Sequence, residues 1–219
     1  MSLKDGFRGN RVYVIVAIFV IIVIVLAVLF SGTGLIPAYV PYDTREGWDE
    51  DIDERKSGSQ LFGLEGWCSF TYRNNNSSYP AYITVTTMKT FFMMNENELK
   101  EKTRGTIIEK ASEQNITIDT KTEISEERTL KNGHATMYVV YNGNYNASEN
   151  ITEQVKFIGE TWNCGKSSTS IICIGYAQIT DNAHNNTELN LKYWEKIIGD
   201  KDGTFTKNPA GLIFNVNCH

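Results

Sequence analysis

The sequence has few of the residues on which enzyme chemistry depends, and those few follow no catalytic pattern. Its 219 residues include three histidines, four cysteines and four prolines. It has no G-x-S-x-G nucleophile turn, no H-E-x-x-H metal motif and no glycine-rich phosphate loop. His134, His184 and His219 lack triad spacing, so each is expected to be structural or to face solvent. The sequence therefore indicates no catalytic residue, no cofactor and no metal ligand.

One long apolar stretch, residues 12–30, is the most distinctive feature of the chain. It contains no charged residue, glycine or proline. As a helix, the stretch would extend about 28 Å, close to the roughly 30 Å of a bilayer's hydrocarbon core. It therefore predicts an N-terminal transmembrane helix. An uncleaved signal anchor fits this length better than a signal peptide does, although the small residues Ser31 and Gly32 leave cleavage open.

The charges around this stretch set the expected orientation. Lys4, Arg8 and Arg11 precede it, whereas the first charged residue after it is Asp43. Basic flanks stay on the cytoplasmic side, so residues 1–11 are expected to be a cytoplasmic tail of a single-pass protein of the cell membrane. Three basic and one acidic residue give this tail a charge of +2, which leaves −7 for the rest of a chain whose total is −5. An acidic extracytoplasmic part argues against nucleic acid, and the expected partners are the lipid bilayer and another membrane or cell-surface protein.

The exported part is expected to consist of a linker and one domain. Residues 31–63 contain several glycines and the charged run REGWDEDIDERKSGS, which predicts an acidic stalk. Residues 64–219 are long enough to bury a core of their own. This domain is therefore expected to fold without the stalk.

The domain is predicted to be α+β, with two helices packed on an antiparallel sheet. Asn95 and Glu98 have capping-box spacing before a helix whose buried face would carry Leu99, Thr103, Ile107 and Ala111. A second helix is expected over residues 188–198. The predicted order is β-β-α-β-β-β-β-α, and the segment LIFNV would add a short closing strand. The main strands are expected at residues 66–72, 82–90, 116–126, 135–142, 154–162 and 170–180.

This element order, together with the segments NGHATMYVVY, IICIGYAQI and YWEKIIG, resembles the PsbP-like fold. The chain also resembles small membrane-anchored exported proteins of methanogenic archaea. The resemblance covers residues 64–198 and includes no catalytic motif. It implies a non-enzymatic binding or assembly role, and it transfers no functional residue to this chain.

Four cysteines lie in the expected extracytoplasmic domain, where disulfides can persist. Cys164 and Cys173 flank one predicted hairpin loop, and Cys68 and Cys218 lie toward opposite ends of the domain. The preferred pairing is therefore Cys164 with Cys173 and Cys68 with Cys218, with free buried thiols as the alternative. No two cysteines have the close spacing of a zinc site, which argues against a metal.

Six asparagines begin N-x-S/T sequons, which makes glycosylation an expectation for an exported domain. They are Asn75, Asn76, Asn115, Asn146, Asn150 and Asn185. Chance alone would give roughly half as many in a chain so rich in asparagine, serine and threonine.

These features favour a membrane-anchored extracytoplasmic binding or structural module. The alternative is a membrane-tethered, hydrolase-like enzyme whose catalytic groups meet only in space. A concave pocket holding titratable groups with perturbed pKa values would favour the enzyme. The apolar run Phe91-Phe92-Met93-Met94 is a candidate contact patch, with burial in the core as the alternative.

Overall fold

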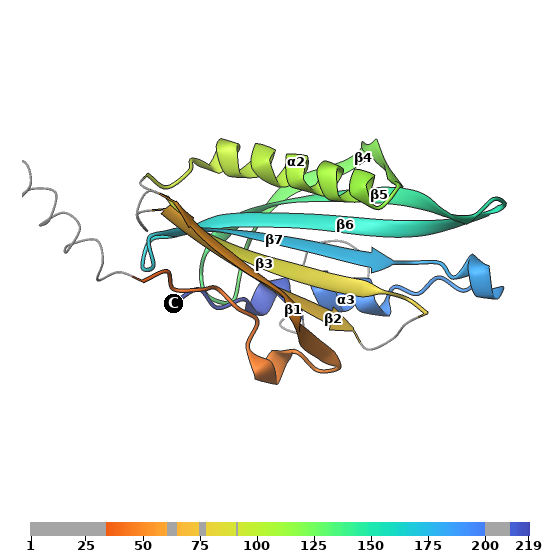
Figure 1. Ribbon diagram of the computed structural model, residues 1–219, viewed down its shortest axis with the longest axis horizontal. Coiled ribbons are helices and arrows are strands. Elements are labelled where there is room, and N and C mark those ends of the chain that lie inside the picture. The colour runs from red at the N-terminus through yellow and green to blue at the C-terminus, as the bar shows by residue number, and fades with distance from the viewer. Residues whose placement is uncertain (1–33, 61–64, 75–77, 91, 200–210) are drawn as a thin grey trace, which may run out of the picture.

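Seven antiparallel strands form one sheet in the order β1-β2-β3-β7-β6-β5-β4, and two helices pack on it (Figure 1). The computed structural model describes residues 34–60, 65–74, 78–90, 92–199 and 211–219. Neighbouring strands are mostly consecutive in the chain, but β3 and β7 join in the middle of the sheet. The elements are β1 (Trp48–Gln60), β2 (Glu65–Asn74), β3 (Ala81–Lys89), α2 (Glu96–Glu113), β4 (Ile116–Thr129), β5 (Ala135–Ser148), β6 (Ile151–Cys164), β7 (Thr169–Gln178) and α3 (Lys192–Ile198), with short 3-10 turns η1 (Tyr42–Thr44), η3 (Asn182–His184) and η4 (Ile213–Asn215).

The two helices lie on opposite faces of the sheet, and each meets a strand glycine. A Cβ atom at Gly159 of β6 would collide with Thr103 and Ile107 of α2. A Cβ atom at Gly175 of β7 would lie 2.6 Å from a methyl carbon of Ile197 in α3. These glycines therefore allow close helix approach. The α3 face, together with residues 38–40 and 212–218, holds the larger core.

The first predicted helix is confirmed in its cap and its buried face. The Asn95 side chain accepts a hydrogen bond from Glu98 N, and the Glu98 carboxylate accepts one from Asn95 N. Leu99, Thr103, Ile107 and Ala111 are buried, as their spacing predicts. The helix is otherwise strongly polar, so packing on the sheet stabilises it more than its own composition does.

The fold class predicted from the sequence is wrong in its strand count, because the segment expected to be a stalk is part of the sheet. The supposed stalk contributes β1, a seventh strand, and the expected closing strand at residues 212–216 is instead the 3-10 turn η4. The predicted transmembrane helix, residues 12–30, lies outside the described residues. Within the described ranges no helix is long and apolar enough to cross a membrane. The architecture supported by the structure is therefore a seven-stranded antiparallel sheet with two helices.

The β1 strand was missed because it lies at the edge of the sheet and carries many charges. Edge strands commonly bear charged side chains and bulges, which prevent pairing with other molecules. β1 follows this rule, since its register with β2 shifts between Asp51 and Lys56. Among the β1 residues whose side chains the structure describes, Trp48 alone is buried in the core. Because apolar and polar residues hardly alternate along this run, its sequence resembles that of a solvated linker.

Candidate functional site

The structure does not bring together the cysteine pairs expected from the sequence. All four cysteines are free and buried. Cys164 lies opposite Thr169 across the β6–β7 hairpin, whereas Cys173 lies opposite Glu160. Cys68 lies between Ser57 of β1 and Thr87 of β3, and it forms no disulfide with Cys218.

Cys164 and Cys218 instead gather with two histidines into one cluster. The potential ligand atoms of His134, Cys164, Cys218 and His219 all lie within 4.8 Å of one another. The Nδ1 atom of His219 is 3.5 Å from the sulfur of each cysteine. The two imidazole rings meet edge to face, with their centroids 5.6 Å apart. The set offers two soft sulfur ligands and two imidazole nitrogens in one place.

Three separate segments converge to build this Cys-His cluster. His134 ends the tight turn between β4 and β5, in which Gly133 takes the positive φ of +85° that favours glycine. Cys164 is the last residue of β6. The segment with Cys218 and His219 is held to the turn by two hydrogen bonds, from Lys131 N to Phe214 O and from Asn132 Nδ2 to Val216 O. The cluster is therefore held in place by hydrogen bonds that do not involve its own side chains.

The two thiols of the cluster differ in acidity. Burial raises the pKa of Cys164, but hydrogen bonds from Ser167, from Cys218 and from the backbone of Lys166 outweigh it and lower the pKa. Burial and the neighbouring Cys164 raise the pKa of Cys218 to about 12. Cys164 is therefore the more acidic thiol of the pair.

One ring nitrogen of His134, the buried Nε2, has no hydrogen-bond partner among the described residues. Burial lowers the pKa of this imidazole, and the adjacent His219 and Lys166 lower it further. The ring is therefore biased toward the neutral form, which is the form that binds metals. A buried nitrogen without a partner costs stability unless something else satisfies it.

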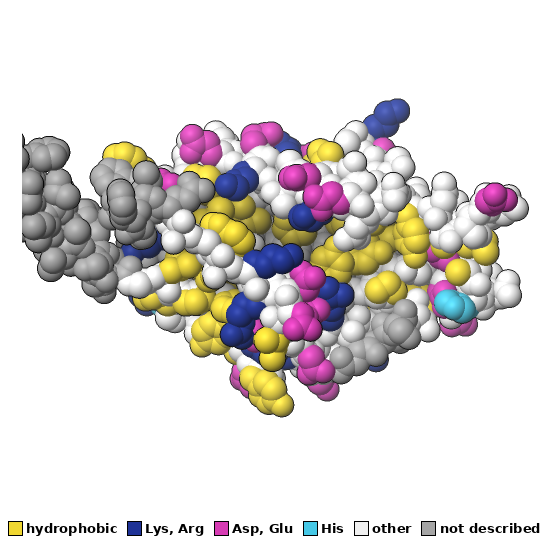
Figure 2. All heavy atoms as spheres, in the orientation of Figure 1, with side chains coloured by type: hydrophobic (Ala, Val, Ile, Leu, Met, Phe, Trp, Pro, Cys, Tyr) yellow, Lys and Arg dark blue, Asp and Glu magenta, His cyan; other side chains and the backbone are white. Residues whose placement is uncertain are grey.

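A second candidate site is the open part of the sheet face beside α2. The helix packs mainly on β6, β4, β5 and β7, which leaves β1 and β2 to one side of it (Figure 1). Figure 2 shows hydrophobic side chains between α2 and the front strands, with charged side chains of both signs gathered nearby. The half-buried residues Tyr82, Thr84 and Thr86 of β3 belong to this open face.

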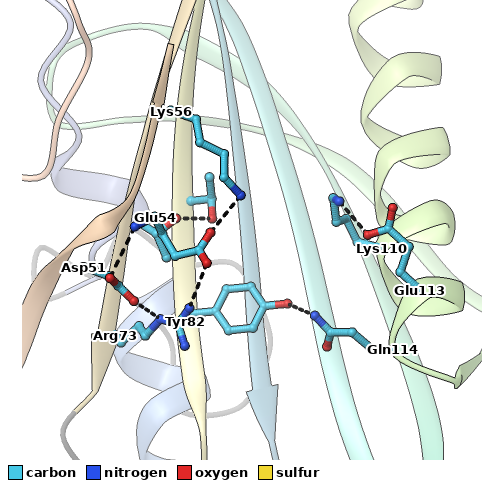
Figure 3. A network of polar contacts seen from close by, with 10 residues as sticks. Asp51, Glu54, Lys56, Arg73, Tyr82, Lys110, Glu113 and Gln114 are labelled. Atoms are coloured by element: carbon cyan, nitrogen blue, oxygen red, sulfur yellow. Dashed lines mark hydrogen bonds and ion pairs between the residues drawn. The ribbon is translucent and has the colours of Figure 1, made fainter.

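Polar contacts connect β1, β2, β3 and α2 across the open face (Figure 3). Arg73 pairs with Asp51 at 2.7 Å and approaches Glu54, which also binds Lys56. Tyr82 stacks on Tyr176, and its hydroxyl accepts a hydrogen bond of 3.4 Å from Gln114 of α2. The charges neutralise one another, so this face is suited to a partner of mixed polarity and not to a polyanion.

The candidate contact patch is exposed in the part that the structure describes. Phe92 is 79% exposed and Met93 47%, whereas Met94 packs against the small core of Met88, Leu99 and Ile172. Phe91 lies outside the described residues. Trp67, 39% exposed, is paired with Met88 at the same end of the sheet.

The remaining residues singled out in the sequence occupy surface positions. His184 is exposed, with Nδ1 2.5 Å from Asp181, and this hydrogen bond raises the pKa of the imidazole. Asn75 and Asn76 lie outside the described residues. The other sequon asparagines are exposed, and glycosylation stays a prediction for Asn115, Asn146, Asn150 and Asn185.

Two cavities lie beside α2. The first, of about 130 Å³, is lined by residues that include Glu96, Glu127, Trp162 and Asn163. The second, of about 400 Å³, lies between α2 and the start of β4 and is lined by aliphatic, hydroxyl and amide side chains. The first cavity is lined by the two carboxylates Glu96 and Glu127, and the lining of the second contains no titratable side chain.

No family model, curated protein or solved structure matches this chain. The resemblance to the PsbP-like fold therefore stays a prediction. The features of the described residues that suit a function are the two candidate sites and the exposed apolar end of the sheet.

Proposed function

We propose that this protein is a non-enzymatic binding module on the outer side of the cell membrane. Residues 1–11 would lie in the cytoplasm, and the apolar stretch of residues 12–30 would attach the protein to the bilayer. Support comes from the basic flank before this stretch and from the acidic composition after it. The protein would thus act at a membrane surface.

The exposed apolar end of the sheet is the observation that carries this proposal. Trp67, Phe92 and Met93 are exposed there, although each is a residue that cores usually bury. The described chain begins at this end, because Ala38 N donates a 2.7 Å hydrogen bond to Thr87 Oγ1, beside Met88. The apolar stretch precedes that point by only a few residues. An aromatic and sulfur-containing surface so placed suits the bilayer interface, where tryptophan is favoured.

Fluorescence quenching in vesicles tests whether this apolar end of the sheet lies at the bilayer interface. Of the four tryptophans, Trp48, Trp162 and Trp194 are buried, and Trp67 alone is exposed. The full chain is reconstituted into phosphatidylcholine vesicles whose acyl chains carry bromine, which quenches nearby indoles. We expect quenching that disappears in a Trp67→Phe variant. Equal quenching in both proteins, or none in either, would contradict contact between Trp67 and the bilayer.

Protease protection tests the orientation. Protease added to intact cells should degrade residues 34–219 and leave a tag at Met1 intact. Protection of the domain together with loss of the tag would overturn the location that we propose.

With the apolar end on the bilayer, the open face would remain accessible to another membrane or cell-surface protein. This binding role can be tested with photo-crosslinkers in living cells. One variant carries the crosslinker at Thr84 on this face, and a control variant carries it at the exposed Lys121 on β4. We expect a discrete adduct from position 84 that is absent from position 121 and is weakened by Tyr82→Ala. The same adducts at both positions, or none at position 84, would contradict a binding role for this face.

A further inference from the structure

The Cys-His cluster has the composition of a structural zinc site. Zinc in proteins is bound tetrahedrally by cysteine sulfur at about 2.3 Å and histidine nitrogen at about 2.0–2.1 Å. A regular tetrahedron with these bond lengths separates sulfur from nitrogen by about 3.5 Å. Both sulfurs lie 3.5 Å from His219 Nδ1. The cluster therefore already has two tetrahedral edges of the right length.

The surroundings also suit thiolate ligands. Asn132 Nδ2 approaches Cys218 Sγ at 3.9 Å, and the turn after β6 directs hydrogen-bond donors of Lys166 and Ser167 at Cys164. Such outer contacts orient metal ligands and stabilise their charge. Binding of a cation by both sulfurs would release the protons of both thiols, because a coordinating thiol is deprotonated.

We propose that His134, Cys164, Cys218 and His219 bind one Zn²⁺ ion and thereby fasten the segment of residues 211–219 to the sheet. Four ligands complete a closed tetrahedral site, so the ion would have a structural role. It would join the β4–β5 turn and the end of β6 to the segment that carries Leu212 and Val216 into the core. This site is independent of the open face and of the membrane location.

A Cys164–Cys218 disulfide is the competing use of the same sulfurs. It would leave both imidazoles without a role, and His134 Nε2 would still lack a partner. Zinc accounts for all four side chains, whereas the disulfide accounts for two. Zinc is therefore the occupant that the cluster favours.

Cobalt titration of the reduced, full chain tests the proposal, since Co²⁺ occupies tetrahedral zinc sites and reports their geometry by visible absorption. We expect one Co²⁺ per chain, the strong visible absorption of tetrahedral sulfur and nitrogen ligation, and displacement by Zn²⁺. Cys218→Ser and His219→Ala should each weaken binding by about tenfold or more, because even supporting residues of metal sites change affinity by about 10–100-fold. Cys68→Ser, outside the cluster, should bind like the wild type.

Thermal unfolding separates ligand loss from misfolding. His219 is exposed, so His219→Ala should fold as the wild type does but lose the rise in Tm that Zn²⁺ gives the wild-type chain. The proposal is overturned if the reduced wild type takes up no Co²⁺ at micromolar concentration, or if Cys218→Ser and His219→Ala bind it normally. A Cys164–Cys218 disulfide in protein isolated without reductant from zinc-supplied cells would also overturn it.

Discussion

Arg128 and Glu160 form an ion pair beneath α3 that is almost completely removed from solvent. Arg128 Nε lies 2.9 Å from Glu160 Oε1, and the carboxylate also accepts a hydrogen bond from Thr136 at 2.6 Å. Arg128 Nη1 donates to the carbonyl oxygen of Ile198 at the end of α3. The pair therefore links β4, β5, β6 and α3 through one buried network.

Removing the charge of Glu160 should destabilise the fold strongly. Glu160→Gln leaves the buried Arg128 without its carboxylate partner, which costs about 3–5 kcal/mol in comparable pairs. Urea denaturation measures the loss. The matched control is Glu54→Gln, which removes an exposed ion pair with Lys56 and should barely move the midpoint. Equal midpoints for the two variants would show that the buried network contributes little.

Gly159 should tolerate no side chain, because α2 lies directly over it. A Cβ atom there meets Thr103 and Ile107, so Gly159→Ala should cost about 1–3 kcal/mol through overpacking. Gly105, exposed on α2 with nothing within 4 Å of an added Cβ, is the matched control. Gly105→Ala should stabilise the protein by about 0.5–1 kcal/mol, because alanine favours helix. The two variants therefore shift the unfolding midpoint in opposite directions, and a shared direction would contradict the packing.

The sequence predicted those parts of the fold in which a local pattern and the tertiary structure agree. The α2 helix had both a capping box and a buried face with helical spacing, and both are confirmed. Six strands lie where β-branched and aromatic residues cluster. β1 was missed because its burial depends on one tryptophan and on its position at the sheet edge. Position in a sheet is a tertiary property that the local sequence does not contain.

The Cys-His cluster was not predictable by spacing rules, because its ligands come from three distant segments. Cys164 and Cys218 are 54 residues apart, and neither belongs to a close cysteine pair. A weak signal did exist. His134 and Cys164 each stand next to a hairpin turn, and successive hairpins can place their turns at one end of a sheet. If the segment with Cys218 and His219 reached the same end of the sheet, all four residues would come together.

Glu123 should contribute stability that depends on pH. Burial acts to raise its pKa, but hydrogen bonds from Tyr141 and Arg104 together lower it below the ordinary value of 4.5. A carboxylate with a lowered pKa stabilises the folded state above its unfolded pKa and loses this effect as pH falls through the folded value. The difference in unfolding midpoint between wild type and Glu123→Gln should therefore be large at pH 7 and small at pH 3. A difference that does not change with pH would contradict this linkage.

Residues 34–63 should be needed for the domain to fold, contrary to the expectation that residues 64–219 suffice. Ala38, Val40 and Trp48 are buried in the larger core, and Val40 N donates a 3.2 Å hydrogen bond to the Tyr72 hydroxyl. Without them, β2 becomes an unprotected edge strand, and the core loses a tryptophan whose removal alone costs about 3–5 kcal/mol.

Two fragments test this requirement. A fragment of residues 34–219 should unfold cooperatively in urea and elute as a single species in size-exclusion chromatography. A fragment of residues 64–219 should aggregate or unfold without a cooperative transition. The point variant Trp48→Ala in the longer fragment should lie between them, since it keeps β1 and removes only the buried indole. If the shorter fragment unfolded cooperatively at the same midpoint as the longer one, the prediction would be wrong. β1 and residues 38–40 would then add no stability, and the core would be complete without them.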